Sequence, residues 1–355
     1  MSQFHKLRIA DIRRETPDTV SVSFEIPDSL KNDFEYIQGQ YITIRADIGA
    51  EDIRRSYSLC SAPSENDFRV AVKKVEGGRM STWLNEKVRA GEELDVMPPM
   101  GNFYVDLDPS SSRHCVGFTA GSGITPIMSI VKETLLKEPS SSFTLFYGNR
   151  TRSDVIFAEE LEKLSAQYNG RLTIHYIMSR ETMPDDLFSG RITTEKCVQL
   201  LDRCVDISGT NAFFLCGPGD MINNVAATLE AKGVDKSKIH FELFTTPVAD
   251  GDAKEVTAEV DGESQVTVIM DGEEYSFALA ANGDPILDAA MDAGVDAPYS
   301  CKGAVCCTCK AKLLEGKAEM EMNYALTDME VEEGYILTCQ AHPTTAKVVL
   351  DYDVV

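Results

Sequence analysis

A cluster of cysteines near the C-terminal end constrains this chain more than any other feature. Four of its ten cysteines follow the spacing C-x₄-C-x₂-C, with the last one 29 intervening residues further on: Cys301, Cys306, Cys309 and Cys339. This spacing calls for one tight loop that aims several thiolates inward, and Gly303 and Ala304 are small enough to let the backbone wrap closely. We therefore expect this region to fold around a bound metal group.

The spacing is that of the ligands of a [2Fe–2S] cluster, whose potential is tuned by backbone amides that donate to the sulfurs. The alternative is a zinc ion held by four cysteines, which more often come as two C-x₂-C pairs. Cys307 is a fifth thiol that the pattern does not require, and we expect a small packing residue there rather than a ligand. Ten cysteines in a long chain that is expected to be intracellular indicate metal or redox chemistry rather than disulfides.

The C-terminal region, residues 258–355, resembles the plant-type ferredoxins. Besides the cysteines, it has two apolar alternating segments, 265–270 and 274–279, around the hairpin turn Asp271-Gly272, and a short helix is predicted over 285–291. The resemblance implies a β-grasp fold and one-electron transfer.

Two further domains precede this one. Residues 1–105 contain short alternating segments, such as 19–24 and 41–44, which predict an antiparallel β-barrel. Within residues 106–245, strand-like runs at 114–118, 143–147, 172–177 and 212–215 alternate with helical stretches, which predicts a doubly wound α/β domain with a parallel sheet. Residues 246–257 have the polar composition of a linker.

Three short motifs can hold phosphates and aromatic rings. They are Arg55-Ser56-Tyr57-Ser58 at a strand end, 77–82 before a helix beginning near Trp83, and 119–126 between a strand and a helix. Arginines and helix N-termini bind pyrophosphate, and glycines let the backbone approach it. Each motif alone is weak, because the tetrapeptide also suits an ordinary half-buried strand and Pro126 departs from the G-x-G-x-x-G pattern.

Together and in this order, the motifs resemble those of the ferredoxin–NADP reductase superfamily over about 240 residues. The resemblance implies that the first motif contacts FAD and the second binds its phosphates, while the third binds the nicotinamide nucleotide. The residues concerned are Arg55, Ser56, Tyr57 and Ser58 in the first motif, Gly78, Met80 and Ser81 in the second, and Gly121, Gly123, Thr125 and Pro126 in the third.

The resemblance also implies a hydride-transfer site beside Ser58. Cys216-Gly217-Pro218 matches the family's Cys-Gly-Pro and would shape this site, although a buried cysteine after a strand is ordinarily inert packing. Phe244 ends a segment like the family's Glu-x-Phe and would cover the flavin, or it is an ordinary core residue.

Ser179 and Arg180 follow the third strand of the α/β domain, where the family recognises the adenosine ribose. An arginine there can neutralise the 2′-phosphate of NADPH, whereas an acid would favour NADH, so NADPH is the expected donor, with Arg150 as a helper. The alternative is that Arg180 is a solvated surface arginine.

Charge restricts the partners. The net charge is −23, of which residues 255–355 contribute −15, so nucleic-acid binding is not expected. The acidic region could steer a basic partner or only provide solubility. Long apolar runs and a secretory signal are absent from the sequence, and we expect a cytoplasmic protein that does not enter membranes.

The domain order, reductase first and ferredoxin last, is similar to that of the reductase components of multicomponent oxygenases. Around residues 301–306 and 334–343 the chain looks most like members that serve the di-iron oxygenase acting on the ring of phenylacetyl-CoA in phenylacetate breakdown. The resemblance implies electron transfer from NADPH to FAD, to the [2Fe–2S] cluster and to that oxygenase complex. The alternatives are a reductase of a steroid or aromatic-ring oxygenase, or a zinc-stabilised nucleotide-binding interaction protein without activity.

Overall fold

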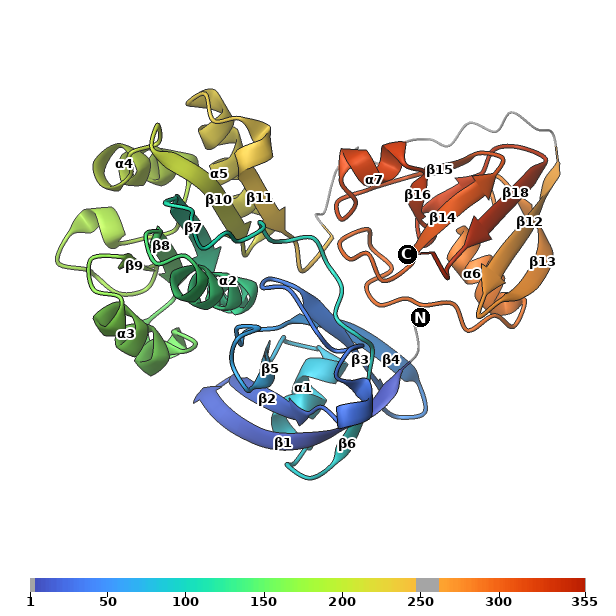
Figure 1. Ribbon diagram of the computed structural model, residues 1–355, viewed down its shortest axis with the longest axis horizontal. Helices are drawn as coiled ribbons and strands as arrows, with labels where there is room; N and C mark the ends of the chain where they lie inside the picture. Colours follow the sequence, from blue (N-terminus) through green and yellow to red (C-terminus); the bar gives the residue numbers. More distant parts are fainter. Residues whose placement is uncertain (1–3, 247–261, 355) are drawn as a thin grey trace.

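The computed structural model describes residues 4–246 and 262–354. Figure 1 shows three lobes in chain order, each built on its own main sheet, and the multidomain fold predicted from the sequence is confirmed. Most of the predicted linker, and the first residues of the predicted third domain, lie outside the described residues.

The first lobe is a six-stranded antiparallel sheet in the order β4-β3-β6-β1-β2-β5. An isolated bridge between Leu59 and Val70 joins its two edges, so the sheet closes into the expected barrel. Helix α1 (Arg79–Glu86) begins earlier than the predicted start near Trp83, because Gly78 already serves as its N-cap. The strands are β1 (His5–Thr16), β2 (Thr19–Glu25), β3 (Tyr41–Asp47), β4 (Asp52–Ser58), β5 (Phe68–Lys73) and β6 (Glu93–Val96), with a 3₁₀ turn η1 (Asp28–Leu30).

The second lobe is a parallel sheet in the order β11-β10-β7-β8-β9, as the alternating pattern predicts. Its central strands are almost continuously buried because apolar clusters cover both faces. The strands are β7 (His114–Ala120), β8 (Ser142–Asn149), β9 (Leu172–Met178), β10 (Thr210–Cys216) and β11 (Ile239–Glu242). The helices are α2 (Ile124–Lys137), α3 (Ala158–Gln167), α4 (Thr194–Cys204) and α5 (Gly219–Ala231), with 3₁₀ turns η2 (Gly121–Gly123), η3 (Arg152–Asp154), η4 (Asp186–Phe188) and η5 (Lys236–Lys238).

The third lobe has a mixed sheet in the order β13-β12-β18-β14-β16 and a two-stranded sheet, β15-β17. The predicted hairpin is present: Met270 pairs with Glu273, and Asp271 and Gly272 have positive φ values of 53° and 76°. Its elements are β12 (Glu263–Met270), β13 (Glu273–Ala280), α6 (Ile286–Asp292), β14 (Lys310–Glu315), β15 (Ala318–Met320), α7 (Asp328–Glu332), β16 (Tyr335–Leu337), β17 (Ala341–Pro343) and β18 (Lys347–Asp351).

Side chains cross both boundaries of the barrel. Lys132 of α2 is buried and pairs with Glu65 of the barrel at 3.1 Å. Arg54 of β4 is buried as well, and it pairs with Asp296 of the third lobe at 2.8 Å while its guanidinium lies over the ring of Tyr299. The barrel therefore holds the other two lobes against itself.

Candidate functional site

A cavity of about 380 Å³, named here the central cavity, lies between the three lobes. The barrel contributes strand β4 and the start of α1, the parallel sheet contributes the end of β11, and the third lobe contributes two cysteines. Its lining includes Tyr41, Arg55, Ser56, Tyr57, Ser58, Lys73, Gly78, Met80, Ser81, Ser122, Thr125, Glu242, Phe244, Thr245, Ser300, Cys301 and Cys306.

A hydrogen bond between two lobes lies in the central cavity. The hydroxyl of Ser58 donates to a carboxylate oxygen of Glu242 at 2.9 Å. Burial raises the pKa of Glu242 to about 8, and the hydrogen bond from Ser58, which lowers this pKa, offsets only part of the rise. Glu242 can therefore hold a proton at neutral pH, within reach of a group bound beside Ser58.

Cys216 lies directly behind this pair, where it ends β10 and pairs in register with Glu242. Burial, assisted by the charge of Glu242, raises the pKa of the Cys216 thiol well above its usual range, so the thiol stays neutral. A Cβ at Gly123 would lie 2.1 Å from the Cys216 carbonyl oxygen, so only glycine lets the loop before α2 approach this strand end.

The start of α1 is suited to a phosphate group. Among the described residues, no side chain caps this helix, and its N-cap is Gly78 in an extended conformation. A Cβ at Gly78 would lie 2.6 Å from the Ser81 hydroxyl, which accepts a hydrogen bond from the Val75 amide at 3.1 Å. With Arg55 on the same wall, free backbone N–H groups and a cation face the central cavity, and this arrangement fits a flavin pyrophosphate.

A second cavity, of about 490 Å³, lies at the carboxyl ends of the parallel strands and is named here the sheet-edge cavity. In open α/β sheets this edge, where the strand order reverses, is the place where nucleotides bind. Its lining includes Lys73, Ala120, Gly121, Ser122, Gly148, Asn149, Arg150, Asp154, Ser179, Arg180, Arg191, Gly217, Pro218, Asp220, Met221, Phe244 and Thr245.

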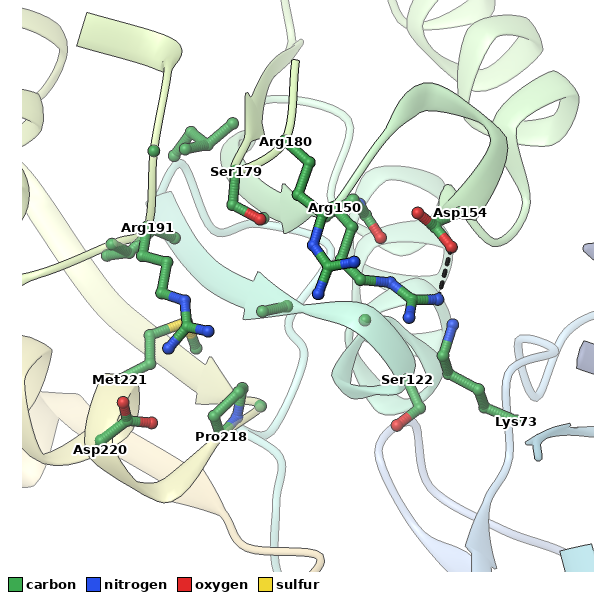
Figure 2. A pocket seen from close by; sticks show the side chains of 18 of the residues that line it. Lys73, Ser122, Arg150, Asp154, Ser179, Arg180, Arg191, Pro218, Asp220 and Met221 are labelled. Atoms are coloured by element: carbon green, nitrogen blue, oxygen red, sulfur yellow. Dashed lines mark hydrogen bonds and ion pairs between the residues drawn. The ribbon is translucent and has the colours of Figure 1, made fainter. Parts of the chain in front are cut away.

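The sheet-edge cavity is basic although the chain is acidic: four of its lining residues are Lys or Arg and two are Asp. Arg150 is already paired, at 2.7 Å from Asp154 and 3.4 Å from Asp18. Arg180 and Arg191 have no carboxylate partner within the part of the chain that the structure describes, and Figure 2 shows their side chains in the cavity. Two unpaired guanidinium groups suit an anionic ligand with more than one phosphate.

The loop that carries Cys301, Cys306 and Cys309, named here the cysteine loop, contributes Cys301 and Cys306 to the wall of the central cavity. The Sγ atoms of Cys301 and Cys306 are 3.1 Å apart, and the thiols of Cys309 and Cys339 form a second hydrogen-bonded pair. The Cys306 thiol and the backbone amides of Gly303 and Val305 lower the pKa of Cys301 to about 7, which favours the thiolate that a metal requires.

The backbone of this loop is tightly wound. Lys302 and Ala304 both lie in the left-handed region, with φ values of 49° and 62°, so the predicted need for small residues is met at Ala304. A Cβ at Gly303 would lie 2.0 Å from the hydroxyl of Thr246, which donates to the Gly303 carbonyl at 2.8 Å.

Two cysteine pairs with amides directed at the sulfurs fit a cluster of two irons, each of which takes two thiolates. Among residues 4–246 and 262–354, no group of three or more His, Cys, Asp or Glu side chains is arranged to hold one ion. Cys307 belongs to neither pair.

Most of the predicted site residues therefore meet in two adjoining cavities. Gly123, Pro126 and Cys216 lie behind the cavity walls, and Cys309 and Cys339 are buried within the third lobe. The hydroxyl of Ser56 is engaged with Ser300 across the lobe boundary at 2.8 Å.

Several residues of the cavity walls were not predicted from the sequence, and three of them bear on the chemistry of the site: Tyr41, Arg191 and Glu242. Glu242 lies within the segment that carried the Glu-x-Phe signal, although only Phe244 was singled out there. Arg191 and Tyr41 had no local signal, because the first lies in a loop without a motif and the second in an ordinary strand. Only the folded chain brings these two side chains to the cavities.

Three features come together at the central cavity: a barrel whose helix start suits a phosphate, a parallel α/β domain and a cysteine loop. Together they indicate a flavin and iron–sulfur oxidoreductase. Three domain families match in the same order: the oxidoreductase FAD-binding domain over residues 6–104, the oxidoreductase NAD-binding domain over 118–227 and the 2Fe-2S iron-sulfur cluster binding domain over 268–344. These matches overturn the alternative of a non-enzymatic interaction protein.

Similar proteins narrow the class. The chain is 40% identical to one of the subunits of the 1,2-phenylacetyl-CoA epoxidase of Escherichia coli (strain K12), over 99% of both chains. It is 35% identical to the ferredoxin reductase component of 3-ketosteroid-9-alpha-monooxygenase of Rhodococcus rhodochrous, over 98% of this chain and 96% of that one. The chain belongs to the family of reductase components of multicomponent oxygenases.

A solved structure shares the fold over the whole length. Phthalate dioxygenase reductase, a modular structure for electron transfer from pyridine nucleotides to [2Fe–2S], aligns with a TM-score of 0.58 and 24% identity over 98% of both chains. Within the described part of the chain, no helix has the length and apolar character needed to cross a membrane.

Proposed function

We propose that this protein takes hydride from NADPH and delivers single electrons to a di-iron oxygenase that epoxidises the ring of phenylacetyl-CoA. The observation that carries the proposal is the 40% identity to a phenylacetyl-CoA epoxidase component over 99% of both chains. The two adjoining cavities and the cysteine loop supply the places that such a transfer requires.

The residues proposed to hold the cofactors follow from the cavity walls. Arg55, Tyr57, Ser58 and the start of α1 at Gly78–Ser81 would hold FAD in the central cavity, and the four paired cysteines would hold the cluster. When bound, FAD accepts hydride as an electron pair and releases electrons singly, and a [2Fe–2S] cluster carries one at a time.

The side chains around Ser58 would hold and orient a proton at the site of hydride transfer. Ser58 Oγ is fixed by Glu242, whose raised pKa of about 8 keeps the carboxyl protonated near neutral pH. Cys216 keeps a neutral thiol behind them. The ring of Phe244, 40% exposed, borders both cavities, and we propose that it covers the flavin side until the nicotinamide ring displaces it.

The preference for NADPH rests on the sheet-edge cavity. The amides of Ser179 and Arg180 donate to the carbonyls of Asn149 and Arg150 at 2.9 and 2.8 Å, which holds the loop after β9 beside the loop after β8. Arg180 and Arg191 have no carboxylate partner among the described residues, so they are available to a 2′-phosphate, whereas Arg150 is paired with two acids.

A second candidate is reduction of a steroid oxygenase, because the ketosteroid monooxygenase reductase component is 35% identical over 98% of this chain. The two candidates differ only in the electron acceptor. The holoprotein should therefore be mixed anaerobically with NADPH and with NADH to follow flavin and cluster reduction. In a separate aerobic assay, it should be combined with each purified oxygenase component and the substrate of that component, because product formation consumes dioxygen.

Rapid flavin bleaching with NADPH, followed by loss of cluster absorbance and by product formation only with the phenylacetyl-CoA oxygenase, is the expected result. Turnover with the steroid oxygenase alone would favour the second candidate. Flavin reduction that is equally fast with NADH would overturn the donor assignment without affecting the rest.

A further inference from the structure

One barrel residue, Tyr41, belongs to the core of another lobe. Its side chain is 5% exposed and packs in the same apolar cluster as the residues of the third lobe, among them Cys307. It also lines the central cavity next to Ser58, its partner in the pairing of β3 with β4. Tyr41 thus spans the distance from the proposed flavin site to the cysteine loop.

The barrel fixes this side chain firmly. The backbone of Tyr41 exchanges two hydrogen bonds of 2.9 Å with Met100. A Cβ at Gly101, whose φ is +117°, would lie 3.0 Å from the tyrosine ring, so a glycine there leaves room for the ring in its observed position. The hydroxyl is therefore presented to the third lobe from a rigid support.

The hydroxyl oxygen meets the cysteine loop between two of the paired cysteines. It accepts a hydrogen bond from the backbone N–H of Cys307 at 3.0 Å, and it lies 3.3 Å from the Cys307 thiol. The hydroxyl of Thr308 is 3.4 Å away, and Thr43, on the same strand as Tyr41, also lies 3.4 Å from Thr308. The contact therefore reaches the backbone of the loop.

The alternative for such a buried tyrosine is packing alone. Packing would need the ring but not an oxygen aimed at a main-chain N–H, and a buried N–H that loses its acceptor is costly. The contact also explains why a small residue occupies position 307, because Cys307 must fit against the tyrosine hydroxyl. Its neighbours Cys306 and Cys309 belong to the two cysteine pairs.

We infer that Tyr41 is a positioning residue that seats the cysteine loop against the central cavity by accepting the Cys307 N–H. The inference rests on the proposed function, since it concerns how efficiently electrons from the flavin side reach the cluster. It assigns no chemical step to the tyrosine itself.

The test uses the full chain loaded with both cofactors and the variant Tyr41→Phe, which removes only the hydroxyl. The matched control is Tyr36→Phe, whose hydroxyl is 3.0 Å from Ser61 within the barrel and forms no hydrogen bond with another lobe among the described residues. Two quantities are measured: hydrogen–deuterium exchange of the amides in residues 302–308, and the rate at which cluster absorbance is lost after the flavin has been reduced.

In Tyr41→Phe, the amides of the loop should exchange about tenfold faster and the cluster should be reduced about tenfold more slowly, the size expected for loss of one buried hydrogen bond. Tyr36→Phe should match the unmodified protein in both. Should Tyr41→Phe fold poorly, Thr43→Val should give the same changes at smaller size, because it removes the neighbouring hydroxyl contact.

Unchanged exchange, or unchanged cluster reduction, in a folded Tyr41→Phe protein would overturn the inference. Failure of the proposed function looks different, since the unmodified protein would then show no cluster reduction following flavin reduction.

Discussion

The two cavities lie side by side and share four lining residues, yet the side chains that line them differ in length, charge and pairing. In the sheet-edge cavity, the groups that face the ligand are long and charged, and Arg180 and Arg191 have no acidic partner among the described residues. In the central cavity, the groups at the proposed site of hydride transfer are short and already paired, since Ser58 and Glu242 satisfy each other at 2.9 Å.

The difference separates recognition from chemistry. Unpaired arginines can adjust to an arriving anion and set which nucleotide binds, whereas a short, mutually bonded pair keeps its geometry before any ligand arrives. Substitutions in the sheet-edge cavity should therefore change affinity, and substitutions in the central cavity should change rates.

The largest effect is expected where the central cavity meets the cysteine loop. Cys306→Ser removes one proposed ligand, so electron transfer to a one-electron acceptor such as cytochrome c should fall to background while flavin reduction by NADPH persists. The control is Cys307→Ser, which should retain the cluster absorbance because Cys307 belongs to neither cysteine pair. Loss of the cluster in the control alone would show that the pairs are wrongly assigned.

Ser58→Ala should give the next largest effect. It removes the donor to Glu242, and the rate of flavin bleaching at saturating NADPH should fall roughly 100-fold, as for loss of a positioned proton-transfer group. The comparison variant is Ser56→Ala, whose hydroxyl faces Ser300, and it should be much milder. An equal fall in the rate of flavin bleaching in both variants would mean that the rate depends on the strand and not on the Ser58–Glu242 pair.

In the sheet-edge cavity, Arg180→Ala should raise the KM for NADPH about tenfold and leave the KM for NADH and the maximal rate nearly unchanged, because the proposed charged hydrogen bond to the 2′-phosphate would be lost. Arg150→Ala should have a smaller effect, since that guanidinium is already paired with Asp154 and Asp18. A fall in maximal rate with unchanged KM would contradict the separation of recognition from chemistry.

The last prediction concerns stability. The pKa of Glu242 is about 8 in the folded protein against an ordinary value of 4.5, so between these pH values the folded state binds more protons than the unfolded state. Folding stability should therefore fall as pH rises through this window, by at most roughly 1.4 kcal/mol per pH unit.

Glu242→Gln cannot titrate and should lack this component. Its Tm relative to that of the unmodified protein should rise steadily from pH 5 to pH 8 in thermal unfolding monitored by circular dichroism. A constant difference in Tm across this range would refute the raised pKa.

The sequence revealed features that depend on neighbours in the chain. The strands of the parallel sheet, the hairpin turn at Asp271-Gly272 and the cysteine spacing follow from local periodicity, turn residues and motif order. Contacts between lobes leave no such signal: Tyr41 and Cys307 are 266 positions apart, and Arg191 lies in a loop without a motif. Glu242 was within a recognised segment, but its high pKa results from burial that only the folded chain produces.

Phe244 lies at the boundary between the cavities, with Lys73, Ser122 and Thr245. Because one ring serves as a wall for both spaces, any change in its volume enlarges or reduces the two together. In the proposed mechanism, nucleotide affinity and the shielding of the neighbouring space from solvent and dioxygen are thus coupled at a single position. A smaller side chain introduced here to admit a bulkier donor would, by the same substitution, also open the adjoining cavity to dioxygen, which would oxidise the reduced cofactor without useful electron transfer.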